Sequence, residues 1–205
     1  MTRRRLLVGV LAGLSLSIAA SASARAVQPD EAAALVDSAI QDVYTAMAGK
    51  NLSREQRVAV LDSMIHRYAN IEKTSETLIG PTWNSASSSD QAAFQQTLVA
   101  YMLALWSEPM GDITPGQKIS ITSSVAHGDK VLVESAATAP HEDPTYLEWT
   151  VASAADGHPF IADVSVEGVS LVRVMKSDFT SVLFANAGHL DGLIAGMQRK
   201  IHSVN

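Results

Sequence analysis

The hydrophobic pattern of the chain changes from the period of a helix to the period of a strand after Trp106, and this change constrains the fold more than any other feature. Up to Trp106 the apolar residues recur every three to four positions, as they do on one face of an α-helix. From Ile119 to Glu167, apolar and polar residues alternate in several short runs, which is typical of half-buried β-strands. Helices followed by consecutive strands predict an α+β chain whose sheet is an antiparallel meander.

Helix-capping signals set the expected ends of the helices. Ser53 with Gln56, and Ser88 with Gln91, have the spacing of a capping box, in which a serine and a glutamine cap each other's backbone amides. The predicted helices cover the segments from Pro29 to Gly49, Ser53 to Tyr68, Glu72 to Leu78, Ser88 to Trp106, and Ser177 to Ser203 with a break around Asn186 to Gly188.

The alternating part of the chain predicts a four-stranded antiparallel sheet. His127-Gly128-Asp129 and Asp156-Gly157 are typical of tight turns between strands, and Gly168 allows the chain to bend after the last strand. The predicted strands are Ile119 to Ser124, Lys130 to Ala137, Tyr146 to Ala152 and Phe160 to Glu167.

The N-terminus has the three parts of a cleaved signal peptide. Thr2-Arg3-Arg4-Arg5 is positively charged, Leu6 to Ala20 is apolar, and Ala24-Arg25-Ala26 has the small residues of a cleavage site. The apolar run is short for a transmembrane anchor. The arginines also fit a twin-arginine signal, so general secretion and twin-arginine export both stay open. We therefore expect residues 1–26 to be removed and residues 27–205 to form a single exported domain.

Charge and cysteine content exclude several classes of function. Cleavage after Ala26 removes four arginines and no acidic residue, which changes the formal net charge from −6 to −10. A chain this acidic is a poor partner for nucleic acid and makes only transient contact with an anionic membrane. The absence of cysteine excludes disulfides, thiolate metal sites, cysteine nucleophiles and attachment of a lipid to a cysteine.

No catalytic motif stands out in the sequence. Phosphate-binding glycine loops, GxSxG and HExxH are absent, so no cofactor, metal or nucleophile is expected. His141-Glu142-Asp143 is the densest group of possible ligands, and a solvated loop explains it better. Asp163 and Glu167 are four residues apart on a predicted strand and would share a face. They form either an acid–base pair or, as we favour, a structural edge of the sheet.

The segment from Phe160 to Phe179, FIADVSVEGVSLVRVMKSDF, resembles a known family. Asp163-x-x-x-Glu167-Gly168-x-Ser170-Leu171, then Lys176-Ser177-Asp178-Phe179 and Gly188-x-Leu190-Asp191-Gly192, is similar to the C-terminal signature of the MlaC-type phospholipid-binding proteins. This family is also called the toluene-tolerance family and includes the hopanoid-associated HpnM branch.

The resemblance implies a fold and a function. Such proteins are similar to nuclear-transport-factor-2-like, or cystatin-like, domains, with a curved antiparallel sheet wrapped by helices around an apolar cavity. The implied function is a non-enzymatic periplasmic shuttle of an ABC-type phospholipid transport system, which maintains outer-membrane lipid asymmetry. Implied partners are a phospholipid or hopanoid, an MlaA-like outer-membrane protein and an MlaD-like inner-membrane complex.

The cavity itself is expected between the third and fourth strands and the helices that contain Val58 and Phe94. Alternation along these strands places apolar side chains on one face, and the helices should face them. The candidate lipid-binding residues are Val58, Ile65, Phe94, Leu98, Tyr101, Leu105, Leu147, Trp149, Val151, Ala162, Val164 and Val166.

Overall fold

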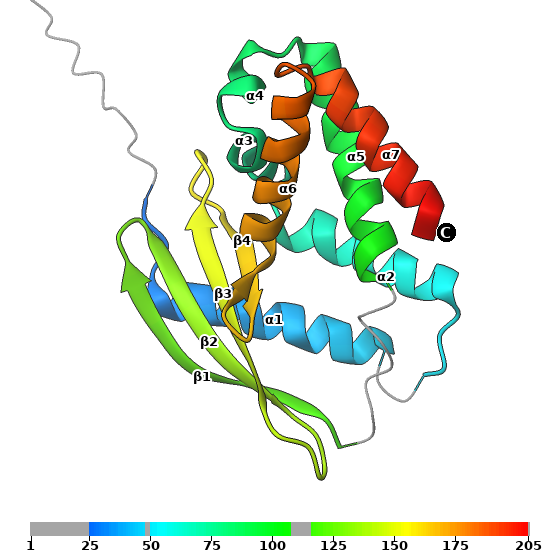
Figure 1. Cartoon of the computed structure of the whole chain (residues 1–205). Coiled ribbons are helices and arrows are strands. Elements are labelled where there is room, and N and C mark those ends of the chain that lie inside the picture. Colours follow the sequence, from blue (N-terminus) through cyan, green and yellow to red (C-terminus); the bar gives the residue numbers. More distant parts are fainter. Residues whose placement is uncertain (1–24, 48–49, 108–115, 205) are drawn as a thin grey trace, which may run out of the picture.

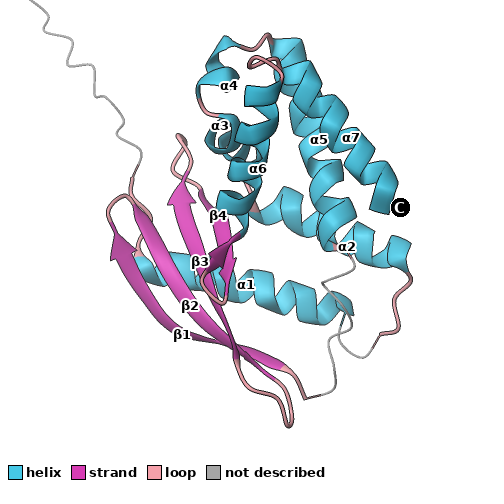
Figure 2. Ribbon diagram, viewed as in Figure 1, coloured by secondary structure: helices cyan, strands magenta, loops and turns pink. Residues whose placement is uncertain are grey.

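The computed structural model describes residues 25–47, 50–107 and 116–204, which form two layers (Figure 1). One layer is a β-sheet crossed by helix α1, and the other is a group of helices beside it (Figure 2). The helices are α1 (Pro29–Met47), α2 (Arg54–Tyr68), α3 (Ile71–Ile79), α4 (Pro81–Ser85), α5 (Ser88–Trp106), α6 (Leu171–Ala185) and α7 (Leu190–Val204). Within the described ranges, no helix is both long and apolar enough to cross a membrane. Nearly all of the predicted signal peptide, residues 1–24, lies outside the described residues, as does the expected helix stop at Gly49.

The sheet is an antiparallel meander, which confirms the predicted α+β class. Its five strands lie side by side in chain order: β1 (Lys118–His127), β2 (Lys130–Thr138), β3 (Thr145–Ser153), β4 (Pro159–Val166) and β5 (Val169–Ser170). The two-residue β5 was not predicted, because so short a strand leaves no alternation to detect. It forms through a tight turn in which Glu167 and Gly168 have φ values of 50° and 77°. Two consecutive positive φ values are the geometry of a type I′ hairpin turn, so Gly168 does provide the expected bend.

Of the two predicted capping boxes, the structure contains the one at α2 but not the one at α5. At α2 the box of Ser53 and Gln56 is present in full. At α5 the prediction was wrong by one residue, because Ser87 caps the helix and its side chain accepts a hydrogen bond from the Asp90 amide. Gln91 instead donates its side-chain amide to the Trp83 carbonyl, at 2.8 Å. It therefore joins α5 to α4, a short helix that the sequence did not predict.

Helix α6 begins six residues before the predicted start at Ser177. Ser170 is its N-cap, and its Oγ accepts a hydrogen bond from the Arg173 amide at 2.9 Å. The first turn contains Val172 and Val174, and β-branched residues such as these are more typical of strands than of helices. The cap at Ser170 and the contacts that α6 makes with the helical layer outweigh this preference.

Most of the buried apolar residues form two separate clusters, one in each layer. The helical cluster contains residues of α2 to α7, among them Ile65, Phe94 and Leu98. The sheet cluster joins Val131, Val133 and Val151 to α1 and contains no residue of α2 or α5. The apolar stripe of α1, with Ala32, Val36 and Ile40, covers this part of the sheet face. That α2 and α5 face β3 and β4 across a cavity stays a prediction.

Gly192 provides a test of how α6 and α7 are joined. A Cβ at Gly192 would lie 2.5 Å from the Cγ and Oδ1 of Asn186, whose side chain donates a hydrogen bond to the Val182 carbonyl. We expect Gly192→Ala to lower the free energy of unfolding by about 1–3 kcal/mol through this clash.

Gly196 is the matched control on the same helix, since its Cβ would meet nothing nearer than 3.7 Å. Gly196→Ala should raise the free energy of unfolding by about 0.5–1 kcal/mol, because alanine is the better helix former. Urea unfolding measures both variants, and similar changes for the two would show that Asn186 does not constrain α7.

Candidate functional site

An apolar strip on β3 and β4 is the strongest candidate for a binding site. Leu147 pairs with Val166, and Trp149 pairs with Val164. Directly opposed residues on antiparallel strands point to the same side of the sheet, so these four side chains form one continuous surface, which we call the β3–β4 strip. All four are half-buried, whereas Val131, Val133 and Val151 on the same face are fully buried against α1.

The polar atom within the strip is satisfied. The Trp149 indole Nε1 donates a hydrogen bond to the Oγ of Ser135 at 2.9 Å, and Ser135 is itself buried. The strip therefore presents apolar surface without an unpaired donor. Apolar surface of this kind, incompletely covered by the protein's own helices, suits an apolar ligand better than a polar substrate.

Tyr44 on α1 belongs to the apolar surroundings of the sheet. It packs against the sheet cluster, and its buried hydroxyl makes no hydrogen bond of normal geometry. Desolvation by burial raises the pKa of Tyr44, and the backbone of Ile119 lowers it by a smaller amount. Burial of the hydroxyl therefore favours its neutral form.

The structure divides the predicted cavity residues into three groups. Ile65, Phe94 and Leu98 are buried in the helical cluster, and Tyr101 packs against it. The ring of Phe179 makes edge-to-face contacts with the rings of Phe94 and Tyr101. Val151 is buried in the sheet cluster, and Trp149 packs against that cluster. The remaining six are half-buried and belong to neither cluster: Val58, Leu105, Leu147, Ala162, Val164 and Val166. Ala162 has no partner on β3, because it lies at a shift in register between β3 and β4.

Asp163 and Glu167 bind different backbone groups and do not form a pair. Asp163 accepts hydrogen bonds from the Ser170 hydroxyl and from the Val172 amide at 3.0 Å, so it anchors the start of α6 to β4. Glu167 lies in the turn after β4, where its carboxylate accepts from the Tyr146 amide at 2.6 Å. The structural alternative for these two carboxylates therefore fits the geometry, and the acid–base alternative does not.

A polar contact joins α1 to α2 and so links the two layers. The Tyr68 hydroxyl donates to Asp42 Oδ2 at 2.6 Å, and Arg67 pairs with the same oxygen at 2.8 Å. The Arg67 guanidinium also lies 5.5 Å from the centre of the Tyr68 ring. Burial, helped by Asp42, raises the pKa of Tyr68 to about 12, while Arg67 acts in the opposite direction.

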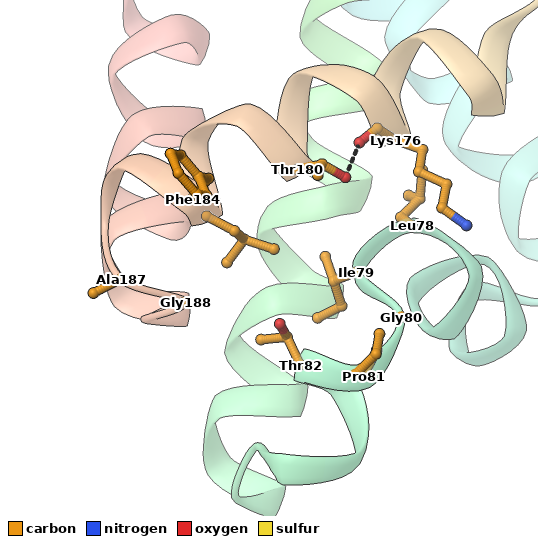
Figure 3. Close-up of a pocket in the computed structure, with 11 residues that line it drawn as sticks. Leu78, Ile79, Gly80, Pro81, Thr82, Lys176, Thr180, Phe184, Ala187 and Gly188 are labelled. Carbon is orange, nitrogen blue, oxygen red and sulfur yellow. Dashed lines mark hydrogen bonds between the residues drawn. The ribbon is translucent and has the colours of Figure 1, made fainter.

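A pocket of about 500 Å³ opens between the end of α3, the start of α4 and α6 (Figure 3). Leu78, Ile79 and Leu183 provide an apolar floor, and Lys176 and the almost fully exposed Phe184 lie on α6 beside it. None of the predicted cavity residues lines this pocket. Gly80-Pro81 and Gly188 mark the helix ends that border it, but the sequence does not show that these ends meet in space.

Metal binding finds no support in the described part of the chain. No three histidine, aspartate or glutamate side chains there lie close enough to hold an ion. His141, from the densest sequence group, lies in the turn between β2 and β3 with a φ of 67°.

Comparison with solved structures identifies the class of this fold. Seven chains match, and one is a phospholipid-binding protein from Ralstonia solanacearum, solved in complex with a phospholipid. The match has a TM-score of 0.73 at 20% sequence identity, and it covers 83% of this chain and 97% of that one. The model of the MlaC protein family matches residues 35–199. This chain therefore belongs to the MlaC family, as the resemblance around Asp163 predicted. No curated protein sequence matches it.

Asp163 can be tested as the anchor of α6. Asp163→Ala leaves the buried Ser170 hydroxyl and the Val172 amide without their acceptor, so we expect the free energy of unfolding to fall by about 2–4 kcal/mol. Asp178→Ala, on the exposed side of the same helix, is the control and should change it by less than about 0.5 kcal/mol. Equal effects in urea unfolding would contradict the anchoring role.

Tyr68 gives the contact between α1 and α2 a pH dependence. An unfolded tyrosine titrates near pH 10, whereas folded Tyr68 has a pKa of about 12, so the folded state holds its proton more tightly. The stability that this difference contributes is complete below about pH 10 and is lost as the pH rises toward about 12. Tyr68→Phe should therefore reduce the alkaline loss of stability, measured by urea unfolding across this range. The exposed Tyr146→Phe should leave it unchanged, and identical profiles for the two variants would refute the assignment.

Proposed function

We propose that this protein binds a phospholipid and carries it through water, with the acyl chains on the β3–β4 strip. The observation that carries the proposal is that three half-buried apolar side chains of the strip, Leu147, Val164 and Val166, belong to neither hydrophobic cluster, and that the fourth, Trp149, lies at the border of the sheet cluster. Membership of the MlaC family and the phospholipid held by a protein of the same fold support this choice of ligand. The separate roles of Asp163 and Glu167 make an exported enzyme that uses these two carboxylates as an acid–base pair the weaker alternative.

Such a carrier must bind a lipid about as strongly as a bilayer does, so that it can both take up the lipid and release it. Two acyl chains contain roughly 30 methylene groups, and burying each is worth about 0.8 kcal/mol relative to water. A bilayer offers nearly the same gain, so transfer between membrane and protein is close to balanced. A modest difference in contacts then decides the direction, and a half-open apolar strip suits this better than a closed cavity.

We infer a cellular setting from the predicted signal peptide and from the family. An exported domain without cysteine, carrying a formal charge of −10 once the signal peptide is removed, fits a periplasmic shuttle that leaves anionic membranes readily. Its partners would be an MlaA-like outer-membrane protein and an MlaD-like inner-membrane complex of an ABC-type system. In that setting the protein would help maintain the asymmetry of outer-membrane lipids. A hopanoid, as in the HpnM branch, is the alternative cargo.

Mass spectrometry of lipid extracted from the protein purified from a periplasm tests the cargo directly. We expect about one glycerophospholipid per protein molecule. A hopanoid in its place would select the alternative cargo. A consistently empty protein, or one that holds only small polar molecules, would refute the carrier function.

Val164 tests whether the strip is where the lipid binds. Val164→Asp places a carboxylate beside the acyl chains, and dehydrating that charge should reduce lipid content by about tenfold or more. Val125→Asp is the matched control on an exposed strand position and should retain its lipid.

A third variant separates the strip from the pocket beside α6. Thr180→Arg fills the pocket between α3, α4 and α6 without touching β3 or β4. Lipid loss in Thr180→Arg, with normal content in Val164→Asp, would place the cargo in that pocket and contradict the strip.

A further inference from the structure

The β3–β4 strip continues to the edge of the sheet and becomes more exposed on the way. Ser135 on β2 pairs with Leu147, Leu147 with Val166, and Val166 with Val169 on β5. Along this row the side chains change from buried Ser135, 1% exposed, through two half-buried residues to Val169, 55% exposed. Beyond Ser135 no polar side chain interrupts the row. The row is therefore an apolar path from the interior to the surface.

The outer end of this path lies where the two layers meet. Val169 follows the Glu167–Gly168 turn directly, and α6 starts two residues later. Within the first turns of α6, Val172 packs against the helical cluster and Met175 is buried in it. Sheet and helical layer therefore come together beside Val169, and Asp163 fixes this junction through its hydrogen bonds to Ser170 and Val172.

The charge around this end differs from that of the whole chain. Residues 166–179 carry Glu167, Arg173, Lys176 and Asp178, which sum to zero, whereas the chain carries −6. Asp163, which is hydrogen-bonded to Ser170 and Val172, adds one negative charge beside this segment. A neutral segment approaches an anionic bilayer with less repulsion than the acidic remainder. Val174 on α6 is also exposed and adds apolar surface to the segment.

We propose that Val169 forms the mouth through which acyl chains pass between a phospholipid bilayer and the β3–β4 strip. On docking, β5 and the first turn of α6 contact the bilayer surface. This inference rests on the proposed lipid-carrier function and adds to it the route by which lipid is loaded. The equally exposed Val125 lacks such a path, because it pairs with Leu132 on the opposite face of the sheet.

The absence of cysteine allows the mouth to be probed by site-specific labelling. Val169→Cys and Val125→Cys, each labelled with the polarity-sensitive dye NBD, are mixed with vesicles of phosphatidylethanolamine and phosphatidylglycerol. Emission from position 169 should shift to shorter wavelength and increase, and emission from position 125 should not change. The same response at both positions, or a response at 125 alone, would overturn the assignment of the mouth.

A transfer assay then tests passage of lipid through the mouth. The rate at which the protein takes up a fluorescent phospholipid from these vesicles is compared for wild type, Val169→Asp and Val125→Asp, and thermal unfolding confirms that all three fold. An acyl chain must pass the new carboxylate at position 169, so transfer should slow by about tenfold, while Val125→Asp transfers at the wild-type rate.

The two proposals fail in different ways. Normal transfer by a folded Val169→Asp overturns the mouth and leaves the carrier function intact. Absence of transfer and of bound lipid in the wild type overturns the carrier function itself. If Val169→Asp does not fold, the labelled cysteine variants decide the question.

Discussion

Helix α1 buries only part of the apolar sheet face, and the rest of the architecture depends on that limit. Val131, Val133 and Val151 are fully enclosed, and burial of each is worth about 1.5–3 kcal/mol. On β3 and β4 the same face continues, but its side chains are only half-buried. The protein therefore gives up part of the burial energy that these valines, leucine and tryptophan could supply, and an apolar ligand that covered them would recover it.

The helical layer does not close over this surface, because it is completed by its own contacts. Phe94, Leu98 and Phe179 lie at the centre of a cluster that includes no residue of the sheet. The layers are linked through the start of α6, which Asp163 holds, and through the contact of Tyr68 and Arg67 with Asp42. Both links are polar and local, and they fix the relative position of the two layers.

The sequence predicted the helices and strands of this fold better than it predicted which of them pack together. Alternation along Leu147, Trp149, Val164 and Val166 identified the apolar face, because a side-chain period of two follows from the local geometry of a strand. It could not show that α1 would cover this face, since α1, α2 and α5 all carry apolar stripes and the choice between them is made by contacts distant in sequence. The start of α6 was missed for a related reason: Ser170 and Asp163 cap it from β5 and β4, and no periodicity records such a cap. The pocket beside Phe184 likewise depends on two turns that meet only in the folded chain.

The division into two hydrophobic clusters has a consequence for the cooperativity of unfolding. Small domains unfold in an all-or-none manner when one shared core couples all their elements. Here no buried apolar residue belongs to both clusters, so each layer can behave as its own cooperative unit, coupled to the other mainly by polar links. A lipid that touched both layers would supply the missing shared core, and the loaded protein would then unfold in a single, sharper step than the empty one.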